Sequence, residues 1–233
     1  MDKELMVQRM FSSAARRYDL NNTVLSFGLH HYWKRYAIDQ ANIKEGGKVL
    51  DVCSGTADIA VLLAKRVGPS GHVTAVDLNP EMLEMGKSKV HKYGLDGLVS
   101  CTLGNAESLQ FGDNRFDAAT VGFGVRNVAD LKKTFTEMYR VVKPGGRVVC
   151  LEFTQPEGRI FRSLYDFYSY TLLPAMGTIL SGDRTGIYQY LPDSIRKFPP
   201  AEALRQLMLG VGFSEVSYTL LSGGIVAVHV GIK

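Results

Sequence analysis

Long apolar runs are missing from this sequence, and so is the apolar stretch that a secretion signal needs. The longest segment without Asp, Glu, Lys, Arg or His runs from Phe167 to Gly182, spans 16 residues and includes Pro174 and Gly177. A membrane-spanning helix needs about 20 apolar residues, so this segment is expected to lie on a surface or to line a pocket. The first ten residues, MDKELMVQRM, carry charges throughout. They exclude an ordinary signal peptide.

Cysteine is also scarce. The chain has three, Cys53, Cys101 and Cys150, which lie far apart in the sequence and in apolar surroundings. An odd number at such spacing gives no indication of a disulfide framework. No histidine has other metal-ligating residues near it in the sequence, so we predict no metal site. Buried thiols in a reducing cytosol fit this pattern, and we therefore expect a cytoplasmic protein.

Neither sign of charge is in large excess. The chain has 27 basic and 23 acidic side chains, a net charge of +4. This balance gives no argument for a nucleic-acid partner, but it is compatible with an anionic lipid surface. The 233 residues, 45% of them hydrophobic, suffice for one α/β core. We predict a single domain over residues 1–233 with an insertion.

Short β-branched runs alternate with helical patterns from residue 47 onward. Asn79 followed by Pro80 marks one helix start. The alternation, and the continuous apolar character of the runs, predict a mostly parallel sheet covered on both faces. Two further strands separated by Ser222-Gly223-Gly224 should close the chain as an antiparallel hairpin. The predicted strands are KVLDVC, HVTAVDL, LVSCTL, FDAATVGF, GRVVCLEF, VSYTLL and GIVAVHVGIK.

Two regions fall outside this alternation. Residues 1–45 are predicted to form an N-terminal helical cap with many aromatic side chains, and residues 157–210 form a long insertion rich in Tyr and Leu. The apolar side chains of the insertion have two interpretations. They complete the core as a helical cover, or they form a mobile lid that lines a ligand channel and touches a bilayer.

The loop after the first predicted strand, DVCSGTADIA, keeps one glycine, Gly55. A dinucleotide site needs G-x-G-x-x-G, so an NAD-dependent oxidoreductase is the least favoured function. Asp51 and Asp58 flank the glycine, and the loop contains no Lys or Arg. Two carboxylates favour a cation, and S-adenosylmethionine carries a sulfonium and an ammonium. The backbone could approach such a donor if Cys53 and Ala57 keep negative φ, with Gly55 supplying any left-handed position.

Polar residues also follow the next two predicted strands. In an open α/β sheet the ligand binds at the carboxyl ends of the strands. Asp77 is therefore placed to bind ribose hydroxyls, and Asn105 and Ala106 should lie along an adenine edge. The predicted donor-binding residues are Asp51, Cys53, Gly55, Thr56, Asp58, Asp77, Leu78, Asn105, Ala106 and Gly122.

A family resemblance extends over nearly the whole chain. The matching stretches are RRYDLNNTVLSFGLHHYWKR, VLDVCSGTADIA, NAESLQF, GFGVRNVADL, LEFTQP, LYDFYSYTLLPAMGTILSGDRTGIYQYLPDSIRKFP and GGIVAVHVGIK. On these the chain resembles the ubiquinone/menaquinone biosynthesis C-methyltransferases, the UbiE family. The family loop usually has the form D-V-A-G-G-T-G-D, so Ser54 and Ala57 replace two glycines and Cys53 replaces alanine here. Asn105 stands where Asp is common.

This resemblance implies a class I S-adenosylmethionine-dependent methyltransferase fold, Rossmann-like, with a mostly parallel seven-stranded sheet, a terminal antiparallel hairpin, N-terminal helices and a helical lid insertion. It also implies transfer of a methyl group from S-adenosylmethionine to a ring carbon of a polyprenylated quinol. Demethylmenaquinol is the favoured acceptor, and the 2-methoxy-6-polyprenyl-1,4-benzoquinol precursor of ubiquinone is the other usual substrate.

Such a transfer requires help at a phenolic oxygen. A ring carbon ortho to that oxygen becomes nucleophilic when the oxygen loses its proton, and free phenols titrate near about 10. Arg126 is too basic to accept the proton itself, but it can stabilise a quinolate or orient a water that removes the proton. We assign this role to Arg126, with Asn127 fixing its geometry and Tyr18 completing the hydrogen-bond network. His30 and His31 are alternative bases, although packing or surface roles are favoured for both.

With the resemblance, the lid interpretation of residues 157–210 is favoured. Two other functions stay open: a methyltransferase for another hydrophobic phenol, and a non-catalytic scaffold of quinone synthesis whose altered loop no longer holds the donor. A homodimer and peripheral contact with the inner face of the cell membrane are open as well. The predicted substrate-binding residues are Phe123, Tyr165, Tyr168, Leu172 and Leu173.

Overall fold

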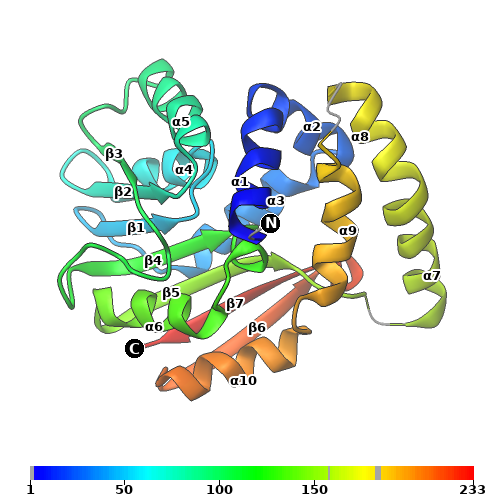
Figure 1. Cartoon of the computed structure of the whole chain (residues 1–233). Helices are drawn as coiled ribbons and strands as arrows, with labels where there is room; N and C mark the ends of the chain where they lie inside the picture. The colour runs from blue at the N-terminus through cyan, green and yellow to red at the C-terminus, as the bar shows by residue number, and fades with distance from the viewer. Residues whose placement is uncertain (1–2, 157, 182–184) are drawn as a thin grey trace.

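The computed structural model describes residues 3–156, 158–181 and 185–233 (Figure 1). Over these residues it contains a seven-stranded sheet in the order β3-β2-β1-β4-β5-β7-β6. The strands are β1 (Lys48–Val52), β2 (His72–Asp77), β3 (Val99–Leu103), β4 (Phe116–Gly122), β5 (Val142–Phe153), β6 (Glu215–Leu221) and β7 (Val226–Ile232).

The first five strands of the chain are parallel, and β7 pairs antiparallel with both β5 and β6. The predicted parallel sheet with a terminal hairpin is therefore confirmed. Because β2 lies on one side of β1 and β4 on the other, strand order reverses at β1. The carboxyl ends of these strands are where a ligand binds in an open α/β sheet.

Helices cover both faces of the sheet. One core cluster packs α3 (Leu29–Gln40) and α4 (Asp58–Val67) against the strands, and the other packs α6 (Leu131–Val141) and α10 (Ala201–Val211) on the opposite face. The predicted start of α5 (Pro80–Lys92) is confirmed, since the Asn79 side chain accepts a hydrogen bond from Met82 N at 3.0 Å.

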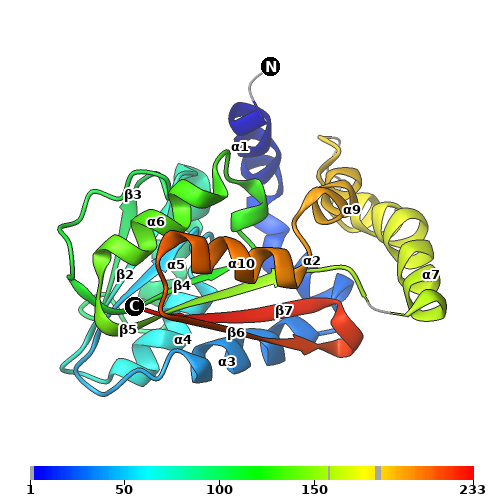
Figure 2. The ribbon, with the colours of Figure 1, turned by 90° about the horizontal axis from the view of Figure 1, so that it is seen from below.

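The remaining helices gather beyond the carboxyl ends of the central strands. In Figures 1 and 2 the N-terminal helices (blue) stand between the sheet and the helices that follow β5 (yellow). A third small core cluster joins the two groups. No helix within the described ranges is both long and apolar enough to span a bilayer. The helices beyond the carboxyl ends of the central strands are α1 (Lys3–Ala14), η1 (Ala15–Arg17), α2 (Tyr18–Leu25), α7 (Arg159–Phe167), the π-helical η3 (Tyr168–Leu172), α8 (Leu173–Ser181) and α9 (Ile187–Lys197).

Candidate active site

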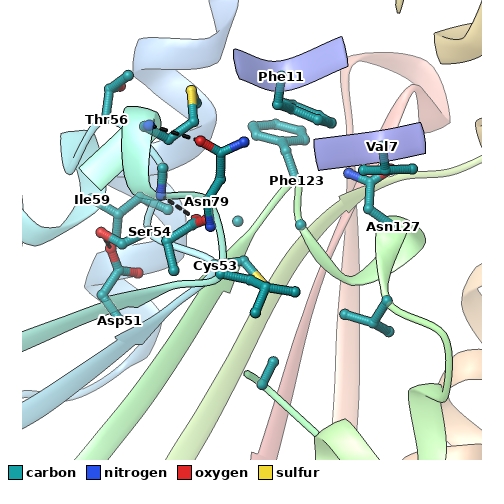
Figure 3. A pocket seen from close by; sticks show the side chains of 18 of the residues that line it. Val7, Phe11, Asp51, Cys53, Ser54, Thr56, Ile59, Asn79, Phe123 and Asn127 are labelled. Atoms are coloured by element: carbon teal, nitrogen blue, oxygen red, sulfur yellow. Dashed lines mark hydrogen bonds between the residues drawn. The ribbon is translucent and has the colours of Figure 1, made fainter. Parts of the chain in front are cut away.

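A cleft opens where the chain leaves β1, β2, β3 and β4, beside the reversal of strand order. The loops after these strands form one wall, and α1 closes the other side (Figure 3). We call this cavity the loop cleft. It encloses about 1130 Å³ of empty space, its open mouth included. All ten predicted donor-binding residues line it: Asp51, Cys53, Gly55, Thr56, Asp58, Asp77, Leu78, Asn105, Ala106 and Gly122.

The loop backbone differs from the expectation of negative φ at its non-glycine positions. Cys53 and Ala57 have φ of 52° and 63°, and Gly55 has 55°. Ser54 N donates to Val76 O at 3.0 Å and Ala57 N donates to Ser54 O at 2.9 Å, which fixes a tight turn. A left-handed non-glycine residue costs about 1–3 kcal/mol. The expectation was wrong because the hydrogen bonds of this turn, and not residue preference, set its φ values.

Room for the loop comes from glycines on neighbouring elements. A Cβ added to Gly124 would lie 2.3 Å from Cys53 Cβ, and one added to Gly86 would lie 3.1 Å from Gly55 O. The loop therefore packs directly on the backbone of α5 and on the turn after β4. Close approach is possible here because these two positions lack side chains.

Asp51 lies inside the cleft wall and is 1% exposed. Its Oδ2 accepts a hydrogen bond from Ser54 Oγ at 2.6 Å, and its Oδ1 accepts one from Thr120 Oγ1 at 2.8 Å. Burial nevertheless dominates and raises the pKa of Asp51 to about 7. A cation bound beside this carboxyl would favour its ionised form.

Two lysines already neutralise the negative charge of Asp58, although the loop itself contains no Lys or Arg. Lys34 Nζ from α3 lies 2.6 Å from Asp58 Oδ2, and Lys89 Nζ from α5 pairs with Oδ1. Lys89 also lies 2.6 Å from Asp19 Oδ2, and Thr56 Oγ1 donates to Asp19 Oδ1 at 2.6 Å. Burial would raise the pKa of Asp58, but the two lysines hold it well below its usual range. The sequence shows no basic residue near the loop because both lysines come from other helices.

Asp77 ties the loop to the end of β2. Its Oδ2 accepts from Gly55 N at 2.7 Å and its Oδ1 accepts from Asn79 N at 2.8 Å. Burial raises the pKa of Asp77, and these backbone donors oppose the rise. A carboxylate offers about four lone-pair sites. Two donors leave acceptor capacity for ribose hydroxyls.

The N-terminal helix α1 completes the cleft. Asn79 Nδ2 donates to Gln8 O and to Ser12 Oγ, both at 3.0 Å, which fastens α1 above the start of α5. Val7, Gln8 and Phe11 line the cleft as a result. These residues were not predicted. They lie about 70 positions from Asn79 in the sequence, and nothing in their local pattern indicates the contact.

A second cavity, which we call the apolar pocket, adjoins the loop cleft and lies between α2–α3 and α7–α9. It encloses about 1450 Å³, its mouth included. Of the predicted substrate-binding residues, Phe123, Tyr165, Tyr168 and Leu173 line it, whereas Leu172 is 43% exposed and lies outside the lining. The residues common to both cavities are Phe11, Tyr18, Asn22, Lys34 and Phe123.

The predicted catalytic residues lie where the two cavities meet. Arg126 lines the apolar pocket, Asn127 lines the loop cleft, and Tyr18 lines both. Asn127 Oδ1 accepts from Tyr190 OH at 3.1 Å, which connects the turn after β4 to α9. Burial raises the pKa of Tyr18, against the opposing charge of Arg126.

Glu152, near the end of β5, is the buried partner of Arg126 and was not predicted. Its Oε1 accepts from Arg126 Nη1 at 2.7 Å, and the same Nη1 donates to Phe123 O at 2.6 Å. Burial raises the pKa of Glu152, and Arg126 opposes the rise. The signal available in the sequence was a carboxylate within an apolar strand, since a buried charge requires a paired cation.

The two neighbouring histidines have different environments. His30 is buried, lines the apolar pocket, and its Nδ1 shares a hydrogen bond with Ser26 Oγ at 2.8 Å. Burial lowers the pKa of His30 to about 4, with Lys34 adding to the effect. His31 is exposed. A neutral imidazole with so low a pKa is a weak base near neutrality.

Comparison with known proteins finds one family and many relatives that match this chain over nearly its whole length. Residues 1–233 match the family described as the ubiE/COQ5 methyltransferase family. The protein named ubiquinone/menaquinone biosynthesis C-methyltransferase UbiE from Pseudoalteromonas translucida is 44% identical over 232 residues, covering 100% of this chain and 92% of the relative. The protein of the same name from Pasteurella multocida is 44% identical over 232 residues, covering 100% and 86%.

Solved structures share the fold. A SAM-dependent methyltransferase from Aquifex aeolicus superposes with a TM-score of 0.60 at 21% identity, covering 85% of this chain and 88% of that one. A putative S-adenosyl-L-methionine-dependent methyltransferase from Methanococcus maripaludis gives 0.64 at 19% identity, covering 95% and 93%. With the sheet order described above, these likenesses confirm the predicted class I methyltransferase fold.

Proposed function

The chain belongs to the ubiE/COQ5 methyltransferase family, and from this premise we propose that it methylates a ring carbon of a polyprenylated quinol, with demethylmenaquinol as its acceptor. It is an S-adenosylmethionine-dependent C-methyltransferase of the quinone-biosynthesis type. The observation that carries the proposal is the shared wall of the two cavities, through which a polar cleft meets an apolar pocket.

The residues of the loop cleft fit the methyl donor. Asp77 retains acceptor sites for ribose hydroxyls, and Asp51 offers a carboxyl whose ionised form a nearby ammonium would favour. The glycines behind the loop allow its backbone to lie against α5. When bound, S-adenosylmethionine supplies an electrophilic methyl group on a sulfonium.

The apolar pocket fits a quinol with its prenyl chain. Its lining is dominated by aromatic and aliphatic side chains, and it includes Arg126, whose charge is buried. A cation there stabilises the quinolate more than the neutral quinol, which favours loss of the phenolic proton. The ring carbon would attack the methyl carbon while the C–S bond breaks with its electron pair staying on sulfur, which leaves S-adenosylhomocysteine. The methylated ring carbon would then lose its proton to solvent and the phenolate oxygen would regain one, which restores the aromatic quinol.

The decisive experiment supplies the purified protein with labelled S-adenosylmethionine and reduced demethylmenaquinol, or the benzoquinol precursor, in parallel. We expect label to enter the naphthoquinol at the higher kcat/KM. Asp77→Ala should abolish both donor binding and transfer. A higher kcat/KM for the benzoquinol would identify that compound, instead of demethylmenaquinol, as the acceptor. Failure of the folded wild-type protein to bind donor would favour a scaffold role instead.

A matched pair of leucines tests where the prenyl chain lies. Leu173→Ala should raise KM for a long-chain quinol by roughly 10-fold and leave a short-chain analogue nearly unaffected, because Leu173 lines the pocket and loses apolar contact. Leu172→Ala, one residue away but outside the lining, should change neither value. Steady-state kinetics with both acceptors gives the answer, and equal losses in the two variants would contradict this path for the chain.

We further propose that the mouth of the apolar pocket rests on a bilayer. Phe27, Leu29 and Leu164 line the pocket and are 74%, 42% and 63% exposed. Exposed apolar side chains around the opening of an apolar cavity would bury their surface in lipid. Flotation with phosphatidylcholine and phosphatidylglycerol vesicles should carry the wild type upward. The double variant Phe27→Asp, Leu164→Asp should remain in the dense fraction without vesicles. Equal flotation of the variant and the wild type would exclude the mouth of the apolar pocket as the membrane contact.

A further inference from the structure

The ion pair between Arg126 and Glu152 is deeply buried, with side chains 5% and 1% exposed. Replacing a buried pair with well-packed apolar side chains is often neutral or stabilising, because desolvation of two charges costs as much as their attraction returns. Stability therefore gives no sufficient reason for charges at this position. Their place beside the acceptor site suggests another role.

Glu152 and the carbonyl of Phe123 together use Nη1 of the guanidinium. Arg126 Nη1 donates to Glu152 Oε1 and to Phe123 O, while Arg126 N lies 3.3 Å from Glu152 Oε2. Phe153 N adds a third donor to the carboxylate at 2.8 Å. Among the described residues neither Nε nor Nη2 of Arg126 has an acceptor, and Nε is itself shielded from solvent, which leaves Nη2 as the donor that a ligand could reach. The guanidinium is thus fixed by Nη1 and keeps donor capacity that the protein does not use.

We propose that Glu152 is a positioning residue for methyl transfer: by holding Nη1 of Arg126 it directs the remaining donors of the guanidinium to the acceptor oxygen and attenuates the positive charge felt by the quinolate. This inference rests on the proposed function. It gives the carboxylate of Glu152 two effects, one on the position of the Arg126 guanidinium and one on the charge felt by the quinolate. Substitutions can separate the two effects.

The groups around the Arg126–Glu152 pair are neutral, so this pair sets the charge near the phenolic oxygen of a bound quinol. The hydroxyls of three tyrosines and the thiols of two cysteines interact with the pair, and burial raises the pKa of each of these groups, so that all are neutral near pH 7. Lys34, which also lines the pocket, is paired with Asp58. The neutral groups are Tyr18, Tyr165, Tyr190, Cys53 and Cys150.

Two substitutions separate charge from geometry. Glu152→Gln keeps an oxygen for Nη1 but removes the negative charge, so the quinolate is stabilised more strongly. The midpoint of the kcat–pH profile should fall by about one pH unit, from one charge removed at short range. Glu152→Asp keeps the charge but withdraws the carboxylate by one methylene. Its midpoint should stay in place while the plateau of kcat falls at least 10-fold, since misplacement by about 1 Å is costly.

Arg126→Lys provides a third test that leaves Glu152 untouched. An ammonium held by Glu152 has no second nitrogen for the acceptor oxygen, so kcat should fall as in Glu152→Asp. Affinity for S-adenosylmethionine should match wild type in all three variants, because neither side chain lines the loop cleft. Wild-type kcat and midpoint in the folded variants would overturn the inference. Absence of quinol methylation by the wild type would overturn the proposed function instead.

Discussion

Replacing Arg126 with Gln is expected to lower kcat for quinol methylation by roughly 100-fold or more, the usual loss when one preorganised donor to a developing oxyanion is removed. Arg126 lines the apolar pocket, and its ion-pair partner among the described residues is the buried carboxylate of Glu152. Without Arg126, a phenol with a pKa near about 10 loses the cation that favours its ionised form. Single-turnover measurements at saturating donor isolate this step.

The control for this loss is donor affinity. Arg126 does not line the loop cleft, so calorimetric titration with S-adenosylmethionine should give wild-type values for Arg126→Gln. Raising the pH should recover part of the rate, because more of the quinol then ionises without help. A variant within threefold of wild type at pH 7 would remove Arg126 from the mechanism.

Replacing Asp51 with Asn is expected to stabilise the ligand-free protein by about 2 kcal/mol at pH 8 while weakening donor binding. Burial raises the folded-state pKa of Asp51 from its ordinary 3.8 to about 7. The folded state therefore holds this proton more tightly than the unfolded chain does. The stabilising contribution of the protonated form is complete below pH 4 and is lost as the pH rises through 7.

An amide at position 51 stays neutral throughout this range, although it keeps only one acceptor for the hydroxyls of Ser54 and Thr120. Urea unfolding at pH 5 and pH 8 measures the effect. The gain of Asp51→Asn over wild type should be present at pH 8 and shrink at pH 5. In the same variant, affinity for S-adenosylmethionine should fall at least 10-fold at pH 8. A stability difference that is the same at both pH values would show that burial of this charge is not its cause.

Sheet and hairpin could be predicted because their signals are local. The continuous apolar strands, the Asn79-Pro80 helix start and the glycines before β7 each act over a few residues. The predicted donor-binding residues lay in one loop and at successive strand ends, and parallel strands bring such ends to one edge. Sequence order and sheet order together were enough to place Asp51 and Asp77 in the same cleft.

The rest of the site depends on contacts between distant segments. Lys34 and Lys89 match the charge of Asp58 from two different helices, and Glu152 reaches Arg126 from the neighbouring strand β5. The positive φ of Ala57 belongs to a turn that hydrogen bonds fix, one of them from Ser54 N to Val76 O on the neighbouring strand β2. None of these contacts has a local pattern, because each is decided by how helices and strands pack.

The helices α1 and α2 form a wall that the two cavities have in common, with Phe11 and Tyr18 facing both. A donor in the loop cleft and an acceptor in the apolar pocket would therefore contact the same two helices. The Asp19–Lys89 pair and the Asn79 contacts with α1 fasten this wall to α5 and its N-cap. A substitution that loosens these contacts is therefore expected to change both cavities at once.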